Sequence, residues 1–256
     1  MSTRLRLLAD LPRAVPLAQI AAVYQPQVSL PANRIVAVEA LSRWNHPELG
    51  MISPADYIEL AEATGDIHEV GRYMFEEAIA CAQSWRESGI EVSVNVSAIE
   101  LSHPLFFTRL AEDLERSQLA PQAITIEITE TQPVLNMPSV VKRLQELIDI
   151  GLGVSIDDYG TGHSSMELLD RLPVTEVKID QSLVRDTSRA STDLMTEVIR
   201  FAHDKNVRVV AEGVETTEQF ERVRELDCDR AQGYLIGRPM SKPDVEALIF
   251  LSQNPS

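Results

Sequence analysis

Two aspartates stand side by side at the end of an apolar run, in the stretch VSIDDYGTG from Val154 to Gly162. Neighbouring residues of a regular strand point to opposite faces, so Asp157 and Asp158 can share one site only where the strand stops and the backbone turns. Gly160 and the glycine that ends the stretch permit such a turn. The two negative charges repel each other, and a bound cation would remove that penalty. A solvated turn is the alternative interpretation, since aspartate and glycine are ordinary turn residues.

Other polar residues lie near the ends of further predicted strands. They are Glu39, Asn95, Glu127, Lys178, Glu212 and Gln232. In a parallel barrel the carboxyl ends of the strands gather at one face, where barrel enzymes build their sites. Each residue alone could be a solvated side chain or a turn former. Seven successive strands with such a residue toward the same end favour one shared site.

Short β-branched runs alternate with longer amphipathic segments along nearly the whole chain. Eight strands are predicted, at 21–28, 34–41, 91–97, 123–130, 153–158, 175–180, 207–214 and 230–236. From the third strand on, every gap holds a helix-like segment, so these strands should be parallel. Only SLPAN separates the first two strands, which is too short for a parallel crossover. We therefore expect an α/β fold, a TIM-like (β/α)₈ barrel with its first strand antiparallel, as one domain over 1–256 with a core of about 18–250.

The composition limits the classes of partner. A formal net charge of −16 disfavours binding to a nucleic-acid polymer or to an anionic membrane surface, because both need a positive surface. An anionic small substrate remains compatible if metal ions neutralise the site. No apolar run approaches the roughly 20 residues of a membrane span, so no membrane insertion is expected. The isolated Cys81 and Cys228, and a first segment without secretory-signal features, indicate a cytoplasmic location.

The oxygen donors at the strand ends indicate the kind of metal. Carboxylates and an amide suit hard divalent cations such as Mg²⁺ or Mn²⁺, and the five histidines are dispersed. Paired aspartates can hold two ions, and two-metal sites support displacement at phosphorus. Lys178 could orient the attacking water, and Arg43 could clamp a phosphate oxygen through its planar fork. These residues predict a metal-dependent phosphodiester or phosphate hydrolase and leave the substrate open.

Eight short motifs then occur in order across residues 24–240. They are YQPQV, VEALSRWNHP, VNVS, IEITET, DDYGTGHSS, VKID, AEGVET and QGYLIGRPM. With them the chain strongly resembles the EAL domain family of bacterial cyclic di-GMP phosphodiesterases. The resemblance implies an enzyme that opens one phosphodiester of cyclic di-GMP, with a ribose 3′ oxygen as leaving group. The product would be linear pGpG, and the level of this second messenger would fall.

The resemblance also implies a role for each matching residue. Metal ligands would be Glu39, Asn95, Glu127 and Asp157, with Asp157 bridging to a second ion shared with Asp158 and, directly or through water, with Glu212. Lys178 would contact the nucleophilic water, Glu130 would hold the loop after the paired aspartates, and Gln232 would support the metal shell. Residues along the substrate groove would be Gln25, Leu41, Arg43, Pro54, Glu100, Asp158, Glu215 and Pro239.

The implied cofactors are two Mg²⁺ or Mn²⁺ ions per active site, with Ca²⁺ inhibitory. A homodimer is implied. Family members often carry sensory or GGDEF domains, so the chain is either the catalytic unit of a longer parent chain, at the cytoplasmic face of the membrane if that parent is anchored there, or a stand-alone protein.

The chain departs from the family pattern at three places. Glu100 stands where family members often have glutamine in NxSxxQL. Its charge could weaken substrate binding, or its carboxylate could accept a hydrogen bond from a guanine N–H. His163 replaces a frequent tyrosine, and LIGRPM replaces the commoner LFSRPL. None of these changes removes a predicted metal ligand.

Two other functions are compatible with the same fold. One is a cyclic di-GMP receptor that no longer catalyses, although such members usually lack a ligand or the lysine. The other is a partner-binding scaffold, which would leave the carboxylates unexplained. Metal-dependent turnover separates the enzyme from both alternatives.

Overall fold

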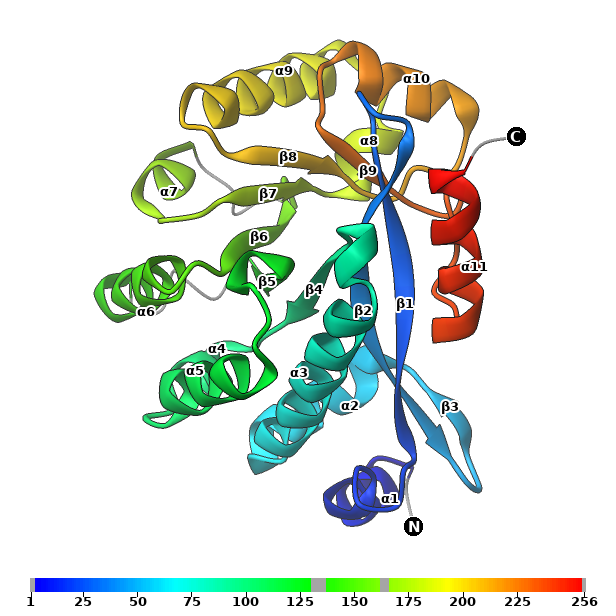
Figure 1. Cartoon of the computed structure of the whole chain (residues 1–256), viewed down its shortest axis with the longest axis vertical. Coiled ribbons are helices and arrows are strands. Elements are labelled where there is room, and N and C mark those ends of the chain that lie inside the picture. Colours follow the sequence, from blue (N-terminus) through cyan, green and yellow to red (C-terminus); the bar gives the residue numbers. More distant parts are fainter. Residues whose placement is uncertain (1–2, 130–136, 162–165, 255–256) are drawn as a thin grey trace.

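The structure, a computed structural model, describes residues 3–129, 137–161 and 166–254. Eight strands of this described part close into a barrel (Figure 1). They are β1 (Ile20–Ser29), β2 (Arg34–His46), β4 (Glu91–Asn95), β5 (Ile124–Thr129), β6 (Gly153–Tyr159), β7 (Glu176–Ile179), β8 (Arg208–Ala211) and β9 (Arg230–Gln232). The sheet order runs β1-β9-β8-β7-β6-β5-β4-β2, and β1 pairs with β2 to close it.

The direction of the strands follows the prediction. β1 is antiparallel to both of its neighbours, β2 and β9. The remaining neighbours in the barrel are parallel, from β2 paired with β4 through to β8 paired with β9. The predicted barrel with a reversed first strand is therefore confirmed.

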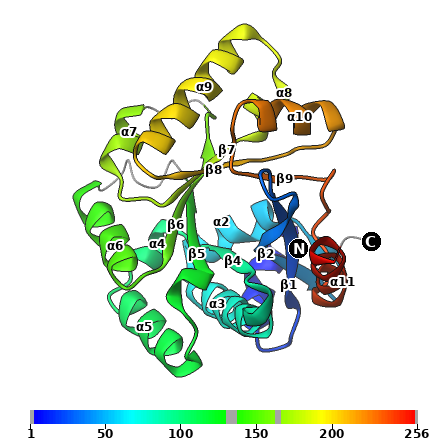
Figure 2. The same ribbon diagram turned by 45° about the horizontal axis from the view of Figure 1, so that its top comes forward.

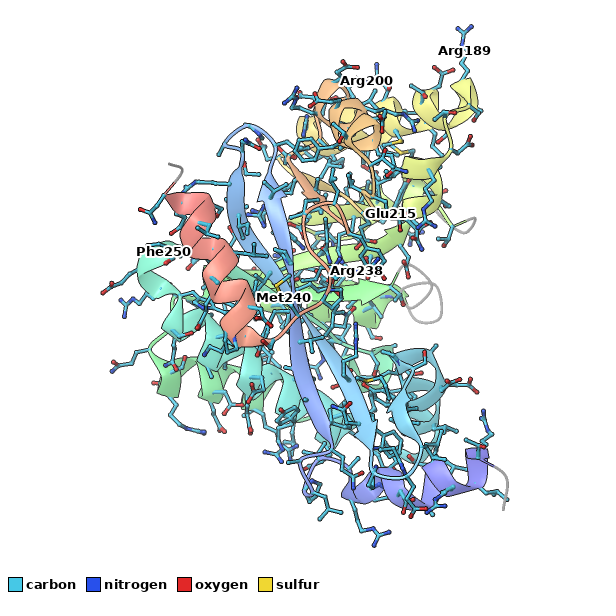
Figure 3. The ribbon with its side chains drawn as sticks, turned by 90° about the vertical axis from the view of Figure 1, so that its right-hand side faces the viewer. Arg189, Arg200, Glu215, Arg238, Met240 and Phe250 are labelled. Carbon is cyan, nitrogen blue, oxygen red and sulfur yellow. The ribbon has the colours of Figure 1, made fainter. Side chains whose placement is uncertain are left out.

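Helices surround the strands, and most lie outside the barrel wall (Figure 2). They are α2 (Pro54–Thr64), α3 (Ile67–Ser84), α4 (Ala98–Leu101), α5 (Phe106–Ser117), α6 (Met137–Asp149), α7 (Met166–Arg171), α8 (Gln181–Arg185), α9 (Arg189–Asp204), α10 (Thr217–Glu225) and α11 (Lys242–Gln253). Figure 3 shows α11 alongside the β1–β2 hairpin, with Phe250 on its outer side. Within the described ranges, no helix is both long and apolar enough to cross a membrane.

Three features differ from the sequence prediction. The helix α1 (Thr3–Asp10) precedes the barrel and buries Leu7, and the short strand β3 (Gly50–Ile52) pairs antiparallel with an extended β2. Strand β9 ends at Gln232, four residues earlier than predicted. The reason lies in Gly233, where a Cβ would stand 2.2 Å from the carbonyl oxygen of Val214. The chain therefore leaves the sheet at a residue that only glycine can occupy.

Alternation along the strands separates an apolar outside from a polar inside. In β5 the residues Ile124, Ile126 and Ile128 are buried in the cluster that packs the helices onto the sheet. The intervening Thr125 and Glu127 point to the opposite face, into the barrel. Both are almost fully buried. The barrel interior is thus lined by polar side chains that must find partners there.

The amino-terminal end of the barrel is closed by four charged side chains. The Arg230 guanidinium contacts Glu91 at 2.8 Å, and Arg208 contacts Glu176 at 2.7 Å. Arg208 also lies 3.2 Å from Glu91, so the charges form a network. Burial alone would raise the pKa of Glu91, but the two arginines lower it. This network lies opposite the predicted site and fixes the bottom of the barrel.

Candidate active site

The paired aspartates converge at an irregularity in β6. Pairing of β6 with β7 shifts register between Ile156 and Tyr159, which is the mark of a bulge. Asp158 has φ of +60°, a left-handed conformation that is uncommon outside glycine. Its N–H donates to Asp157 Oδ1 at 3.0 Å. The sequence predicted that the strand stops at the paired aspartates. Instead the strand continues to Tyr159, and the bulge within it brings both carboxylates to the same site.

Lys178 lies at the centre of the carboxylates that the sequence placed at the strand ends. Its Nζ is 2.7 Å from Glu212 Oε1, 2.9 Å from Glu127 Oε2, 3.2 Å from Asp157 Oδ1 and 3.3 Å from Glu39 Oε2. The lysine side chain is completely buried. Strands β2, β5, β6 and β7 and the residue after β8 thus deliver five side chains to one point. We call these five residues the lysine cluster.

The electrostatics of the lysine cluster follow from burial and from an excess of acids. Burial raises the pKa of Glu127 and of Glu212 well above the ordinary value, and neighbouring carboxylates add to this. Burial alone would lower the pKa of Lys178, but the four carboxylates raise it. Burial alone would raise the pKa of Glu39, but Lys178 and the hydrogen-bond donors around this carboxylate lower it below the ordinary value. One cation therefore serves four acids, and the cluster has room for more positive charge.

Amide side chains orient Glu39 from two directions. Asn95 Nδ2 donates to Glu39 Oε1 at 2.8 Å, and Gln232 Nε2 donates to Glu39 Oε2 at 2.6 Å. Gln232 Nε2 also donates to Gln25 Oε1 at 3.2 Å. Gln27, which the sequence analysis missed, donates to Gln232 Oε1 at 2.9 Å. The alternation Gln-Pro-Gln in β1 places both glutamines on the inward face, and that was the available signal.

The donor set fits divalent metal ions. One oxygen each of Asp157, Asp158 and Glu212 lie within 4.8 Å of one another. Within the part of the chain that the structure describes, Glu127 Oε1 is buried and accepts no hydrogen bond. A buried carboxylate oxygen without a partner is costly unless a cation binds it. All these donors are oxygen atoms, which suits Mg²⁺ or Mn²⁺.

Two hollows meet at the lysine cluster. The first hollow, about 480 Å³, lies between β2, α2, α3 and the turn after β4. The second hollow, about 280 Å³, lies beside α8 and the loop after β8. Both are lined by Glu39, Leu41 and Asp158, so they form one continuous groove across the carboxyl end of the barrel.

Most of the predicted groove residues line these hollows. Leu41, Arg43 and Pro54 line the first hollow. Leu41 also lines the second, together with Gln25 and Glu215. Pro239 is half-buried and is not among the lining residues of either hollow in the described part of the chain. Glu130 and His163 lie outside the described residues.

Glu215 and Arg43 have partners of their own. Arg185 Nη2 donates to Glu215 Oε1 at 2.8 Å at the edge of the second hollow, and Figure 3 shows Glu215 close to this end of the barrel. Arg43 Nη1 donates to the Ser42 carbonyl at 2.8 Å and lines the first hollow. The sequence analysis missed Arg185, because it lies on a short helix without a distinctive motif.

The fold and this site define a barrel with an acidic, metal-compatible centre at the carboxyl ends of its strands. The sequence model of the EAL domain family matches residues 8–239. The chain therefore belongs to the EAL domain family.

Characterised relatives and solved structures agree with this assignment. The chain is 36% identical over 242 residues to the bifunctional diguanylate cyclase/cyclic di-GMP phosphodiesterase MucR of Pseudomonas aeruginosa, covering 93% of this chain and 35% of that protein. It is 36% identical over 247 residues to the oxygen sensor protein DosP of Escherichia coli, covering 94% and 31% respectively. The chain thus spans about a third of the length of these relatives.

A solved structure described as the PaMucR phosphodiesterase in complex with c-di-GMP superposes with a TM-score of 0.87 at 35% sequence identity. That comparison covers 94% of this chain and 99% of the other. An EAL domain protein from Listeria monocytogenes superposes with a TM-score of 0.82 at 28% identity, covering 93% and 96%.

Proposed function

We propose that this chain is a metal-dependent phosphodiesterase that hydrolyses cyclic di-GMP to linear pGpG. The observation that carries the proposal is the lysine cluster, in which Lys178 Nζ lies within 3.3 Å of a carboxylate oxygen of each of its four acids, at the centre of a two-ended groove. Relatives named as cyclic di-GMP phosphodiesterases, and the related structure in complex with c-di-GMP, support the choice of substrate.

The ligand set divides naturally between two ions. Glu39, Asn95, Glu127 and Asp157 would hold one ion, and Asp157 would share the other with Asp158 and Glu212. Bound Mg²⁺ or Mn²⁺ would make a water acidic enough to attack phosphorus and would neutralise charge on the phosphate. Ca²⁺ prefers more ligands at longer distances, which fits its expected role as an inhibitor.

The remaining side chains position the reactants. The ammonium group of Lys178 lies inside the ligand set and can donate a hydrogen bond that orients the attacking water. Arg43 lines the first hollow and can bind phosphate oxygens through two parallel N–H groups. Gln232 and Asn95 hold the Glu39 carboxylate in place from either side. Hydrolysis then breaks the bond from phosphorus to the ribose 3′ oxygen and leaves a 5′-phosphate on pGpG.

The oligomeric state and the accompanying domains are proposed from the family resemblance. We expect a homodimer, and we expect the phosphodiesterase unit to act with sensory or GGDEF domains of a longer parent chain. The relatives named above are longer proteins, one of them named as a cyclase as well as a phosphodiesterase and one as an oxygen sensor.

The test is a chromatographic time course of cyclic di-GMP with Mg²⁺, with Mn²⁺ and with chelator. We expect metal-dependent pGpG from the wild type and none from Asp157→Asn. Asp193→Asn is the matched control, because Asp193 is exposed on α9 and, within the described residues, pairs only with Arg189. Binding of cyclic di-GMP without turnover under every condition would contradict the enzyme and select the receptor.

A further inference from the structure

Glu100 is a buried acid in the wall of the first hollow. It is only 5% exposed, although its position near the mouth of the barrel suggested contact with substrate. Its Oε2 accepts a hydrogen bond from the Ser97 N–H at 3.0 Å, and Ser97 Oγ accepts one from the Glu100 N–H at 3.2 Å. The two residues form a capping box at the start of α4. The carboxyl group is thus turned toward its own helix start.

The second oxygen of Glu100 fills a socket in α3. A Cβ built on Gly71 would lie 1.5 Å from Glu100 Oε1, so any larger residue at position 71 would collide with the carboxyl group. Glycine inside a helix costs about 1 kcal/mol relative to alanine, and here that cost accompanies a close approach. Behind the socket is a cavity of about 60 Å³, lined by residues of α3 and α5. A displaced carboxyl group would have space to move into.

Within the part of the chain that the structure describes, the Glu100 carboxyl group forms no ion pair. Within the described residues no lysine, arginine or histidine nitrogen lies within the 4.0 Å of an ion pair with its carboxyl group. The other charged or titratable side chains that line the first hollow are Glu39, Arg43, Glu62, Asp157 and Asp158. Those that line the small cavity behind the socket are His68, Arg72, His103, Arg109 and Asp113. Burial raises the pKa of Glu100 to about 7, and the nearby Glu62 adds to the effect. The Glu100 carboxyl group is therefore held by a hydrogen bond and by packing against Gly71, and this arrangement suits a structural role better than an ion pair.

The capping box connects directly to a predicted metal ligand. Asn95 ends β4 two residues before Ser97, and its Nδ2 donates to Glu39 in the lysine cluster. The N–H of the intervening Val96 donates to the Glu127 carbonyl at 2.9 Å. The turn from Asn95 to Ser97 is therefore fixed by β5 on one side and by Glu100 on the other.

We propose that Glu100, seated in the Gly71 socket, is a positioning residue that locks the turn after β4 and so holds Asn95 at the metal site. This inference rests on the proposed function, because it concerns the metal that the function needs. Residues that orient a metal ligand change metal affinity by about 10- to 100-fold when they are removed.

The test measures Mn²⁺ affinity by isothermal titration calorimetry without substrate, and Ser97 amide protection by hydrogen exchange without metal. Glu100→Gln keeps the shape and the acceptor, so Mn²⁺ affinity should stay within about twofold of the wild type. Glu100→Ala removes the carboxyl acceptor of the Ser97 N–H, and Gly71→Ala expels the carboxyl group. Both should weaken Mn²⁺ binding by at least about tenfold and should remove protection of the Ser97 amide. If Gly71→Ala fails to fold, Glu100→Ala carries the test.

Ser188→Ala is the matched control, since Ser188 caps the remote helix α9 through the Ser191 N–H. It should lower stability and leave Mn²⁺ affinity unchanged. Wild-type Mn²⁺ affinity in a folded Glu100→Ala variant would overturn the positioning role, as would an equal loss in Ser188→Ala. A wild type that binds no Mn²⁺ would overturn the proposed function first, and the inference with it.

Discussion

Replacing Lys178 by methionine removes the one cation among four carboxylates and keeps most of the side-chain volume. Each of the four N–O distances is between 2.7 and 3.3 Å. At an effective dielectric constant of about 20, one such contact has a gross attraction of about 5 kcal/mol. Desolvation offsets most of this, and the carboxyl groups can take up protons. Removal of one partner from a buried ion pair typically costs about 3–5 kcal/mol, which is our expectation for metal-free Lys178→Met.

The assay is urea unfolding at pH 7.5, once with chelator and once with excess Mn²⁺. We expect Lys178→Met to lose the full ~3–5 kcal/mol of unfolding free energy in chelator and less with Mn²⁺, because divalent ions neutralise the same carboxylates. Lowering the pH should also restore stability, since Glu127 and Glu212 have raised pKa values and become neutral as the pH falls. Lys205→Met removes an exposed lysine paired with Asp170 and should change stability by less than about 0.5 kcal/mol. Equal unfolding free energies of wild type and Lys178→Met in chelator would refute the electrostatic account.

Three further predictions concern separate parts of the molecule. Mn²⁺ binding should release protons from Glu127 and Glu212, whose pKa values burial raises, so the calorimetric heat should depend on the buffer's ionisation enthalpy; a buffer-independent heat would contradict this. The pKa of Glu100 is about 7 in the folded protein against an ordinary value of 4.5. Its contribution to the free energy of unfolding is therefore fully present below pH 4.5, and up to about 3 kcal/mol of it is lost as the pH rises through 7. Glu100→Gln should abolish that part of the pH dependence of urea unfolding, and an unchanged slope would exclude it. Arg230→Met should cost about 3 kcal/mol, because Glu91 loses its 2.8 Å partner, yet leave Mn²⁺ affinity unaltered; a weakened affinity would show that the two ends of the barrel are coupled.

The strands and their order were predictable because their pattern is local. In β5 the alternation of isoleucine with threonine and glutamate predicts that the isoleucines contact the helices and that the polar residues point into the barrel. The SLPAN connection likewise fixed the antiparallel hairpin by its length alone. Lys178 and its four carboxylates could be placed at one end of the barrel for the same reason, since each lies late in its strand or just after it.

Features that depend on pairing register were not predictable. The bulge that gives Asp158 its φ of +60° arises from the pairing of β6 with β7, and the flanking glycines suggested a turn in its place. The charged network at the bottom of the barrel joins strands that are far apart in the sequence, so no spacing of residues predicts it. Its members are Arg208, Arg230, Glu91 and Glu176. The motif gives the position of Glu100 beside the substrate groove, but it does not reveal the Gly71 socket, because Gly71 lies on a helix distant in sequence.

The most direct measurement of the central claim is the hydrolysis of cyclic di-GMP in H₂¹⁸O with Mn²⁺, analysed by mass spectrometry of the product. Water activated among the carboxylates around Lys178 should place one ¹⁸O in the 5′-phosphate of pGpG and none in the ribose. Chelator should stop the reaction. Intact cyclic di-GMP with Mn²⁺, or pGpG without the label in its phosphate, would contradict the proposed hydrolysis.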